Sequence, residues 1–354
     1  MSCTKSNAVN RKQYFLVVLP TLNCNYKCWY CIQDHVPSVM SSDVMESICN
    51  HIDYMITQEH IESLHLDWFG GEPFMFFDKI IKPISEFAIK ECQKYGIPFI
   101  NSATTNGFFI NNKVSKQLSE LKFCQFQITL DGEKKFHDKV KFTKGCDSAF
   151  DYVLNNINHL LSDNKSIRVF LRINYTHETL TIKIVDEVNS LIDIQNRDRV
   201  IITPKKVWQE KVDKDFNIIL VELLDLFELS GYKVARKDMS STFTPCYVNQ
   251  KYYNSINYNG HVVKCTACDD LYSETPYGIL KPDGLIEWRD NYEKKCIQPS
   301  FENERCLNCK ILPACMGLCP RDYMLGLKRC KYDAMDEDFE KSLFDFIKKE
   351  YADK

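Results

Sequence analysis

The sequence predicts an α/β protein, an open partial (βα)6 barrel followed by a small cysteine-rich domain. From residue 13 to about residue 210, short apolar runs alternate with longer amphipathic segments, as in parallel strands covered by helices. Six such units are too few for a closed barrel of eight strands, so an open barrel is expected. After residue 240, nine of the 17 cysteines lie between Cys246 and Cys330, which indicates a separate module.

The expected elements follow one another with short connections. The first strand, Tyr14–Leu19, is a continuous apolar run of the kind found in buried parallel strands. Ser41 and Asp43 can cap a helix whose apolar side chains fall on one face. The other strands are expected at Leu64–Phe69, Phe99–Ala103, Gln125–Leu130, Ile167–Asn174 and Val200–Thr203. The other helices are expected at Ile80–Lys94, Ser148–Leu161 and Thr179–Ile192, with one more that ends at Leu118–Leu121.

Four segments divide the chain. Residues 13–210 form the barrel core, and residues 211–239 form a bridging helix and a short strand. Residues 240–332 form the cysteine-rich domain. Residues 333–354 form a C-terminal helix, in which acidic residues precede basic ones, an order suited to the helix dipole.

Composition and charge exclude several classes of protein. The chain has 354 residues, 44% hydrophobic and 26% charged, so it can bury a full core and is not disordered. Its 45 Lys and Arg nearly balance its 48 Asp and Glu, which argues against a general binder of nucleic acids or anionic membranes. No apolar run reaches the roughly 18 residues that cross a bilayer. Many cysteines without an export signal predict the reducing cytoplasm, where thiols serve metals rather than disulfides.

A cysteine loop follows the first strand directly. It reads NCNYKCWYCIQ and places Cys24, Cys28 and Cys31 at C-x3-C-x2-C spacing. Thiolates this close in sequence can hold one soft metal centre. A 4Fe–4S cubane would keep one iron open with three ligands, whereas structural zinc needs a fourth ligand that is absent nearby. An unfinished zinc knuckle and three unrelated core cysteines are the alternatives.

Other unusual residues also follow strands. Gly70-Gly71-Glu72-Pro73 ends the second strand, Thr105-Asn106-Gly107 the third, and Asp131-Gly132 the fourth. Active sites of such folds lie at the C-terminal ends of the strands, so these segments are expected to meet there. Paired glycines let the backbone approach a ligand closely, although a plain tight turn is the alternative for GGEP.

Together these motifs resemble those of the radical S-adenosylmethionine (SAM) enzymes. The resemblance covers residues 13–210 and rests on the cysteine loop, GGEP, TNG, and ITLDG at 128–132 followed by His137-Asp138. It implies that Cys24, Cys28 and Cys31 hold a 4Fe–4S cluster whose open iron chelates SAM. Reductive cleavage of SAM would then give a 5′-deoxyadenosyl radical that removes hydrogen from an unactivated C–H bond.

The resemblance also implies contacts with SAM. Tyr30 would lie near the adenine, and Gly70, Gly71 and Glu72 on the methionyl amino group. Thr129 stands where a serine is more usual near the SAM carboxylate. The remaining candidates are Asn106 and Arg172, the latter either a ligand of the same carboxylate or a structural ion-pair residue.

The C-terminal cysteines, C-x13-G-x4-C, C-x2-C-x5-C-x3-C and a last C, resemble the SPASM extension of radical SAM maturases. The run before Pro320 has a spacing similar to that of bacterial ferredoxins, in which the cysteine before the proline serves a different cluster. Two interleaved zinc sites are the alternative. The resemblance implies two auxiliary 4Fe–4S clusters, three clusters in all, the first held by Cys246, Cys265 and Cys319 and the second by Cys306, Cys309, Cys315 and Cys330.

One position departs from the SPASM pattern. Fully ligated members carry a further cysteine just before the first, and residues 237–245 contain none. The iron left open is expected to bind a substrate thiolate or carboxylate, unless Cys268 closes the site; that residue is otherwise a core thiol. Cys296 is interpreted as structural. The scattered cysteines Cys3, Cys49, Cys92, Cys124 and Cys146 are interpreted as ordinary buried or incidental residues.

The resemblance implies a maturase that forms an intramolecular thioether, ether or C–C crosslink in a ribosomal precursor peptide. An anaerobic sulfatase-maturing enzyme is the alternative, although Thr266 stands where that subgroup has an acidic residue. An iron–sulfur electron carrier is a third. The expected partners are the peptide, a reductant such as flavodoxin or ferredoxin, and a separate leader-binding protein, because the first strand begins near residue 14. Residues 247–258 either line a peptide groove or pack as a strand.

Overall fold

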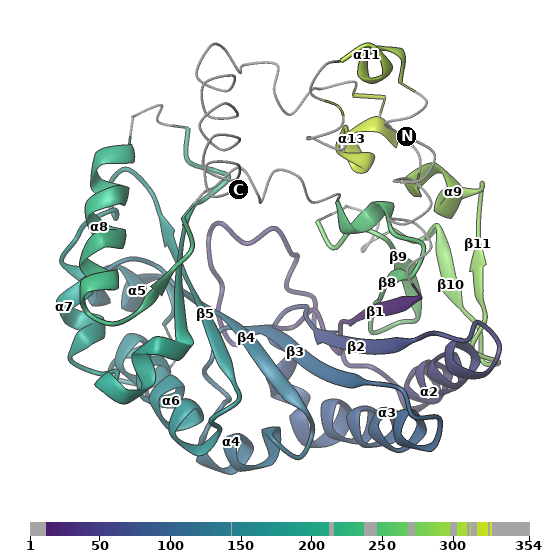
Figure 1. The fold of residues 1–354 in the computed structure, drawn as a ribbon, viewed down its shortest axis with the longest axis horizontal. Helices are drawn as coiled ribbons and strands as arrows, with labels where there is room; N and C mark the ends of the chain where they lie inside the picture. Colours follow the sequence, from purple (N-terminus) through teal and green to yellow (C-terminus); the bar gives the residue numbers. More distant parts are fainter. Residues whose placement is uncertain are drawn as a thin grey trace, which may run out of the picture.

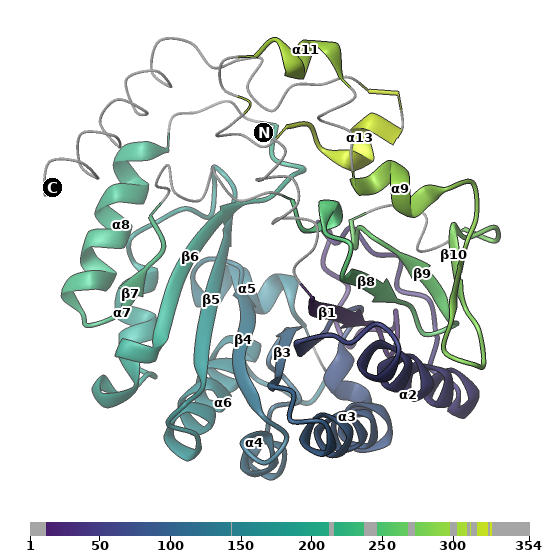
Figure 2. The ribbon, with the colours of Figure 1, turned by 45° about the vertical axis from the view of Figure 1, so that its right-hand side comes forward.

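The strands of the described residues form one sheet, in the order β11-β10-β9-β8-β1-β2-β3-β4-β5-β6-β7. The structure is a computed structural model that describes residues 12–142, 144–211, 216–236, 246–267, 273–297, 303–309, 312, 317–324 and 326–327. The sheet curves into an open barrel, with helices on its outer face (Figures 1 and 2). The predicted α/β fold with a parallel core is therefore confirmed.

Seven neighbouring strands run parallel and make the barrel wall. The six predicted strands appear in the predicted order, and β7, the predicted short strand, joins the edge next to β6. Buried apolar side chains such as Leu16, Leu66 and Phe126 face the helical layer and form the core. The strands are β1 (Gln13–Val18), β2 (Ser63–Trp68), β3 (Phe99–Thr105), β4 (Phe123–Leu130), β5 (Arg168–Tyr175), β6 (Val200–Lys206) and β7 (Lys233–Val234).

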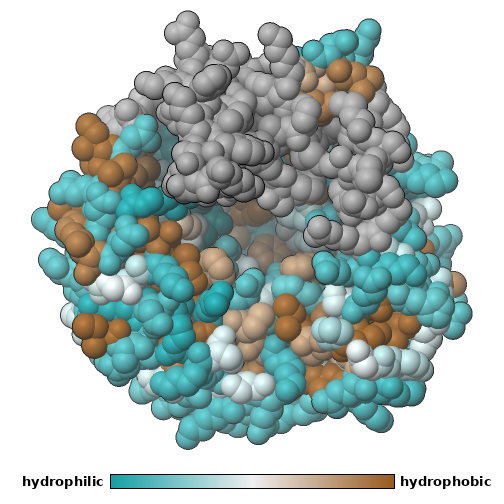
Figure 3. Space-filling model, in the orientation of Figure 1, coloured by the Kyte–Doolittle hydropathy of each residue, from teal (hydrophilic) through white to brown (hydrophobic). Residues whose placement is uncertain are grey.

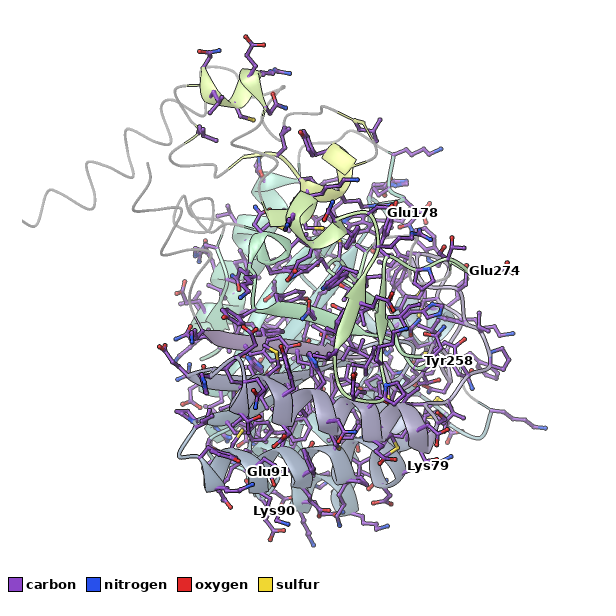
Figure 4. All side chains as sticks on the ribbon, turned by 90° about the vertical axis from the view of Figure 1, so that its right-hand side faces the viewer. Lys79, Lys90, Glu91, Glu178, Tyr258 and Glu274 are labelled. Atoms are coloured by element: carbon purple, nitrogen blue, oxygen red, sulfur yellow. The ribbon has the colours of Figure 1, made fainter. Side chains whose placement is uncertain are left out.

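The helices that cover these strands begin at side-chain caps. The Ser41 hydroxyl accepts the Val44 N–H, as the sequence predicted, and the Ser148 hydroxyl accepts the Asp151 N–H. Exposed charged side chains such as Lys79 point away from the sheet (Figure 4). The helices are α2 (Ser42–Thr57), α3 (Lys82–Lys94), α4 (Asn112–Leu118), α5 (Lys134–Val140), α6 (Ala149–Asp163), α7 (Ile184–Asn189) and α8 (Asn217–Leu229).

Some helix boundaries differ from the prediction. The helix expected over Thr179–Ile192 is only α7, because Thr176 and Thr179 bond to each other's backbone and side chains in a turn that competes with helix. The helix expected to end at Leu121 ends at Leu118. The short helix α5 was not predicted at all. Among the described residues, no helix combines the length and the apolar character needed to span a membrane.

The cysteine-rich segment extends the same sheet. β8 (Tyr253–Ile256) pairs in parallel with β1, and β9 (His261–Val263), β10 (Gly278–Leu280) and β11 (Ile286–Trp288) follow in antiparallel order. Beyond them lie η5 (Tyr247–Asn249) and the helices α9 (Tyr292–Ile297), α11 (Glu304–Leu307) and α13 (Pro320–Met324) (Figure 2). The C-terminal helix expected over residues 333–354 lies outside the described residues.

A buried chain of hydrogen bonds ties this extension to the core. The Nδ1–H of His51, on α2, donates to the Gly284 carbonyl at 2.6 Å, since a carbonyl can only accept. Its Nε2 therefore accepts the Tyr14 O–H at 2.6 Å, and the Tyr14 oxygen accepts the Asn254 amide at 3.0 Å. Four segments from both halves of the chain are thus joined through one neutral imidazole.

This histidine is expected to make stability depend on pH. Burial lowers the pKa of His51 from 6.5 to about 4. Between these values the unfolded chain binds a proton there and the folded chain does not, so the free energy of unfolding falls as pH falls, by up to about 1.4 kcal/mol per pH unit. Urea unfolding at pH 7, 6 and 5 should give a flatter dependence for His51→Leu. The exposed His159→Leu serves as control, and equal slopes in wild type and His51→Leu would contradict the assignment.

Candidate active site

A cavity opens at the C-terminal edge of the parallel strands, where the cysteine loop between β1 and α2 lies. Its empty space is about 1050 Å³ with the mouth included. A hollow is visible near the middle of the face shown in Figure 3. The cavity is lined by the three cysteines, by six of the predicted SAM contacts and by residues that the sequence did not single out: Cys24, Cys28, Cys31; Tyr30, Gly70, Gly71, Asn106, Thr129, Arg172; Gln127, Lys141, Asn174, Trp208.

The three thiols of the cysteine loop are half-buried beside one another. The Tyr26 N–H points at the Cys24 sulfur at 3.4 Å, and the Asn106 amide lies 3.8 Å from it. Burial raises the pKa of Cys24 to about 12 and also raises the pKa of Cys28 and Cys31. Such thiols stay protonated until a metal displaces the proton.

The donor set fits a cluster better than a single ion. Within the part of the chain that the structure describes, no three His, Cys, Asp or Glu side chains converge on a point that would hold one metal ion. A 4Fe–4S cluster takes one thiolate at each of three irons, so its ligands surround a cavity rather than meet. Cys24, Cys28 and Cys31 all line the cavity, as that arrangement requires.

GGEP pairs with the base of the cysteine loop. The Gly71 N–H donates to the Thr21 carbonyl at 3.1 Å, and the Glu72 N–H to the Asn23 carbonyl at 2.8 Å. A Cβ at Gly71 would lie 2.0 Å from the Asn23 oxygen, and Gly70 has a φ of +102°. Both glycines are therefore needed for the close approach of two backbones, and their surface also lines the cavity.

The Glu72 carboxylate lies below the cavity, not in it. It is fully buried and accepts the Phe74 N–H at 3.0 Å, the Thr105 hydroxyl at 2.7 Å and the Asn106 N–H at 2.7 Å. Burial raises the pKa of Glu72 to about 7, against these hydrogen bonds. Its side chain thus joins GGEP to the loop after β3, and it is not among the residues that line the cavity.

A buried network around Asp131 supports Tyr30. The Tyr30 hydroxyl donates to Asp131 Oδ1 at 2.5 Å, and Lys141 Nζ lies 3.0 Å from Oδ2 and 2.7 Å from the Thr129 carbonyl. The Asp131 N–H donates to Nδ1 of His137, whose pKa burial lowers to about 3. Burial opposes ionisation of Asp131, but the Lys141 ammonium and the Tyr30 hydroxyl hold its pKa below the ordinary value. The sequence showed the Asp-Gly and His-Asp pairs; Lys141, one helical turn after His137, was missed.

Arg172 reaches the same cavity from β5. Its Nε donates to the Asn174 side chain at 2.8 Å, and among the described residues no carboxylate lies within ion-pair distance of it. Of the two interpretations made from the sequence, a structural ion pair is therefore not formed. The guanidinium remains available to an anionic ligand in the cavity.

The described auxiliary cysteines lie in two places. Cys246 precedes η5, Cys265 follows β9 and Cys319 precedes α13, and the Cys319 thiol contributes to the raised pKa of Cys265. Cys306 and Cys309 lie at α11, around a small apolar cluster with Leu318. Cys268, Cys315 and Cys330 lie outside the described residues.

The aromatic segment over residues 247–258 contains the short helical turn η5 and the strand β8. Tyr252 and Tyr253 are buried, and the Tyr247 and Tyr253 rings lie 4.5 Å apart. β8 within this segment pairs with β1. Of the two interpretations, strand packing beside Cys246 and Cys265 is what the structure shows.

Gly71→Ala is expected to displace the cysteine loop. Because the added Cβ meets the Asn23 oxygen, the free energy of unfolding should fall by more than about 2 kcal/mol, and the iron bound after anaerobic reconstitution should fall with it. At Gly96 a Cβ meets no atom within 4 Å, and only its φ of +67° opposes alanine. Gly96→Ala should cost about 1 kcal/mol and leave the iron content unchanged. Full iron in Gly71→Ala would contradict this role.

Asp131→Asn is expected to leave the Lys141 ammonium buried without a carboxylate. The side chain of Lys141 is only 3% exposed, so urea unfolding should show a loss of about 3 kcal/mol. Replacing both residues, as Asp131→Asn with Lys141→Met, should recover most of that loss because no buried charge then remains. Additive losses in the double variant would show that the pair is not coupled.

No family model matches the chain, but comparisons with individual proteins find relatives. It is 22% identical over 339 residues to the radical SAM cyclopropyl synthase TigE of Paramaledivibacter caminithermalis, a match that covers 84% of this chain and 65% of TigE. It is 26% identical over 143 residues to the cysteine-type anaerobic sulfatase-maturating enzyme of Clostridium novyi, a match that covers 38% of this chain and 37% of that enzyme. The chain thus spans less than two thirds of the length of these curated relatives.

Solved structures share the fold. Native anSMEcpe with bound AdoMet and Cp18Cys peptide superposes with a TM-score of 0.59 at 18% identity, covering 94% of this chain and 96% of that one. Streptococcus suis SuiB bound to precursor peptide SuiA gives 0.59 at 16% identity, over 90% of this chain and 74% of SuiB. Related to these proteins in sequence or in fold, the chain is a homologue of the radical SAM/SPASM-type enzymes.

Proposed function

We propose that the chain is a radical SAM/SPASM peptide maturase. It would cleave SAM reductively and form an intramolecular thioether, ether or C–C crosslink in a ribosomally made peptide. The proposal rests on one observation. Cys24, Cys28 and Cys31 line the same cavity as the paired glycines and the polar residues of four strand ends. When bound, the cluster and SAM supply the hydrogen-abstracting 5′-deoxyadenosyl radical.

The residues of this chain would bind and orient the cofactor. The three thiolates hold the cluster, and the backbone of Gly70 and Gly71 takes the methionyl amino group. Arg172 and Thr129, which line the cavity, would bind the SAM carboxylate. Tyr30, fixed by its bond to Asp131, would contact the adenine.

A peptide substrate is supported by the shape of the mouth. A second cavity adjoins the first and shares Tyr30, Asn174, Val207 and Gln209 with it. Trp208, on the wall of the first cavity, and Trp29, on the wall of the second, are 65% and 59% exposed. Exposed aromatic side chains at an opening are typical of surfaces that bind peptides. The SuiB and anSMEcpe structures each hold a peptide.

The proposal includes further components. Two auxiliary 4Fe–4S clusters on the SPASM cysteines, three clusters in all, would serve electron transfer. A cytoplasmic flavodoxin or ferredoxin would be the reductant, and a separate leader-binding protein would deliver the peptide. Only Cys246, Cys265, Cys306, Cys309 and Cys319 of those cysteines are among the described residues.

Formylglycine formation on a sulfatase is the second candidate. Both cysteine-type and serine-type sulfatase-maturating enzymes are relatives, each over about two fifths of this chain, at 38% and 42%. Against it, Thr266 follows Cys265 where that subgroup has an acidic base, and the Thr266 hydroxyl bonds to the Tyr247 side chain. An electron carrier is disfavoured because it needs no cavity beside the cysteine loop.

Reduced, anaerobically reconstituted protein is expected to convert SAM to 5′-deoxyadenosine, measured by liquid chromatography. Cys28→Ala should abolish the product because one thiolate of the cluster is lost. Cys92→Ala, a buried cysteine on α3 outside the cavity, should retain it. Iron analysis should give about twelve irons per chain for three clusters and about four for one. Reconstituted, reduced protein that holds iron yet yields no 5′-deoxyadenosine would overturn the proposal.

The two candidate products differ in chemistry. A crosslink removes two hydrogens and suppresses the fragments between the joined residues in tandem mass spectra. Formylglycine is an aldehyde and reacts with a hydrazide probe. Candidate precursor peptides and a sulfatase peptide, incubated side by side with the enzyme and SAM, therefore separate the maturase from the sulfatase-maturing enzyme.

A further inference from the structure

Cys296 is buried in the middle of the SPASM segment. It lies on α9 and has no exposed surface. α9 packs against η5, which begins directly after Cys246, and against α13, which begins directly after Cys319. The fold therefore brings Cys296 to the place where the three cysteines of the first auxiliary site come together.

Cys296 also lies near the third of those cysteines. Cys265 and Cys296 belong to one buried cluster that includes Val248 and Tyr292, with Cys246 packed against its edge. The Cys265 thiol is close enough to Cys296 to interact with it electrostatically. Four cysteines from four separate segments thus surround a single region. A cysteine that served packing alone would not require three other cysteines nearby.

A fixed positive charge stands beside this group. Lys264 precedes Cys265 and is fully buried; its ammonium donates to the carbonyls of Gln250, Lys251 and Tyr253 at 2.9, 2.9 and 2.6 Å. Its charge favours the thiolate of Cys296 and so opposes the effect of burial on the pKa of that thiol. A cluster with four thiolates is anionic, and a buried cation nearby offsets the cost of placing it away from water.

We propose that Cys296 is the fourth thiolate ligand of the auxiliary cluster on Cys246, Cys265 and Cys319. The inference rests on the proposed function, because it takes that cluster to be present. On ligation the Cys296 thiol releases its proton to solvent and a sulfur–iron bond forms, with no change in oxidation state. The site is then complete without an upstream cysteine and without Cys268, and it has no iron open to substrate.

The test uses full-length protein in which Cys24, Cys28 and Cys31 are all alanine. Only auxiliary clusters then bind iron, about eight atoms per chain. ¹³C-cyanide, which binds an open iron, is added to the reduced protein and followed by electron–nuclear double resonance. This triple variant is the background for the further substitutions, and it is expected to show no ¹³C coupling. Adding Cys296→Ala should either produce ¹³C coupling or lower the iron to about four.

Matched variants keep the result clear. Cys92→Ala, an equally buried cysteine on α3, and Cys268→Ala should leave both the iron count and the spectrum of the background unchanged. Cys296→Ser repeats the test with a smaller change in volume, and thermal unfolding of metal-free protein checks its fold. Coupling to ¹³C already in the background, or a Cys296→Ala protein identical to it, would overturn the assignment.

Failure of this inference is distinguishable from failure of the proposed function. Protein with intact Cys24, Cys28 and Cys31 that cleaves SAM, while Cys296→Ala changes nothing, removes only the ligand assignment. If the background variant binds no iron, the auxiliary clusters and the Cys296 assignment are both wrong. SAM cleavage, measured separately, then still tests the radical chemistry.

Discussion

The site depends on one backbone contact, the pairing of GGEP with the start of the cysteine loop. The N–H groups of Gly71 and Glu72, after β2, donate to two carbonyls of the segment after β1 at 3.1 and 2.8 Å. The approach is so close that no side chain fits at Gly71. Because both segments leave neighbouring parallel strands, the sheet itself sets their separation. The cysteine loop, which has little regular structure, is thereby held against a rigid edge.

Two buried carboxylates extend this support in different ways. Glu72 accepts three hydrogen bonds from neutral donors and joins the loops after β2 and β3. Asp131 is paired with Lys141 and fixes Tyr30 at the cavity wall. Neither carboxylate faces the open cavity as a free base. Their role is to hold the groups that do, so that the cavity wall is preorganised by its supporting residues.

Much of the fold could be predicted because the alternation of apolar runs and amphipathic helices is strong. The strand ends then placed the cysteine loop, GGEP, TNG and Asp-Gly together, and the structure does so. The sequence could not show that the Glu72 side chain turns away from the cavity, because that depends on three donors from other segments. Lys141 was missed because Asp131, its partner, comes next to it only after folding.

The pairing of β8 with β1 makes the two halves of the chain mechanically continuous. A hinge between them would have to break a row of ladder hydrogen bonds. Removal of the C-terminal portion would also leave β1, an apolar strand, with an unpaired edge. Such an edge recruits strands from other molecules. The cysteine-rich segment therefore protects the barrel from self-association, in addition to any role in electron transfer.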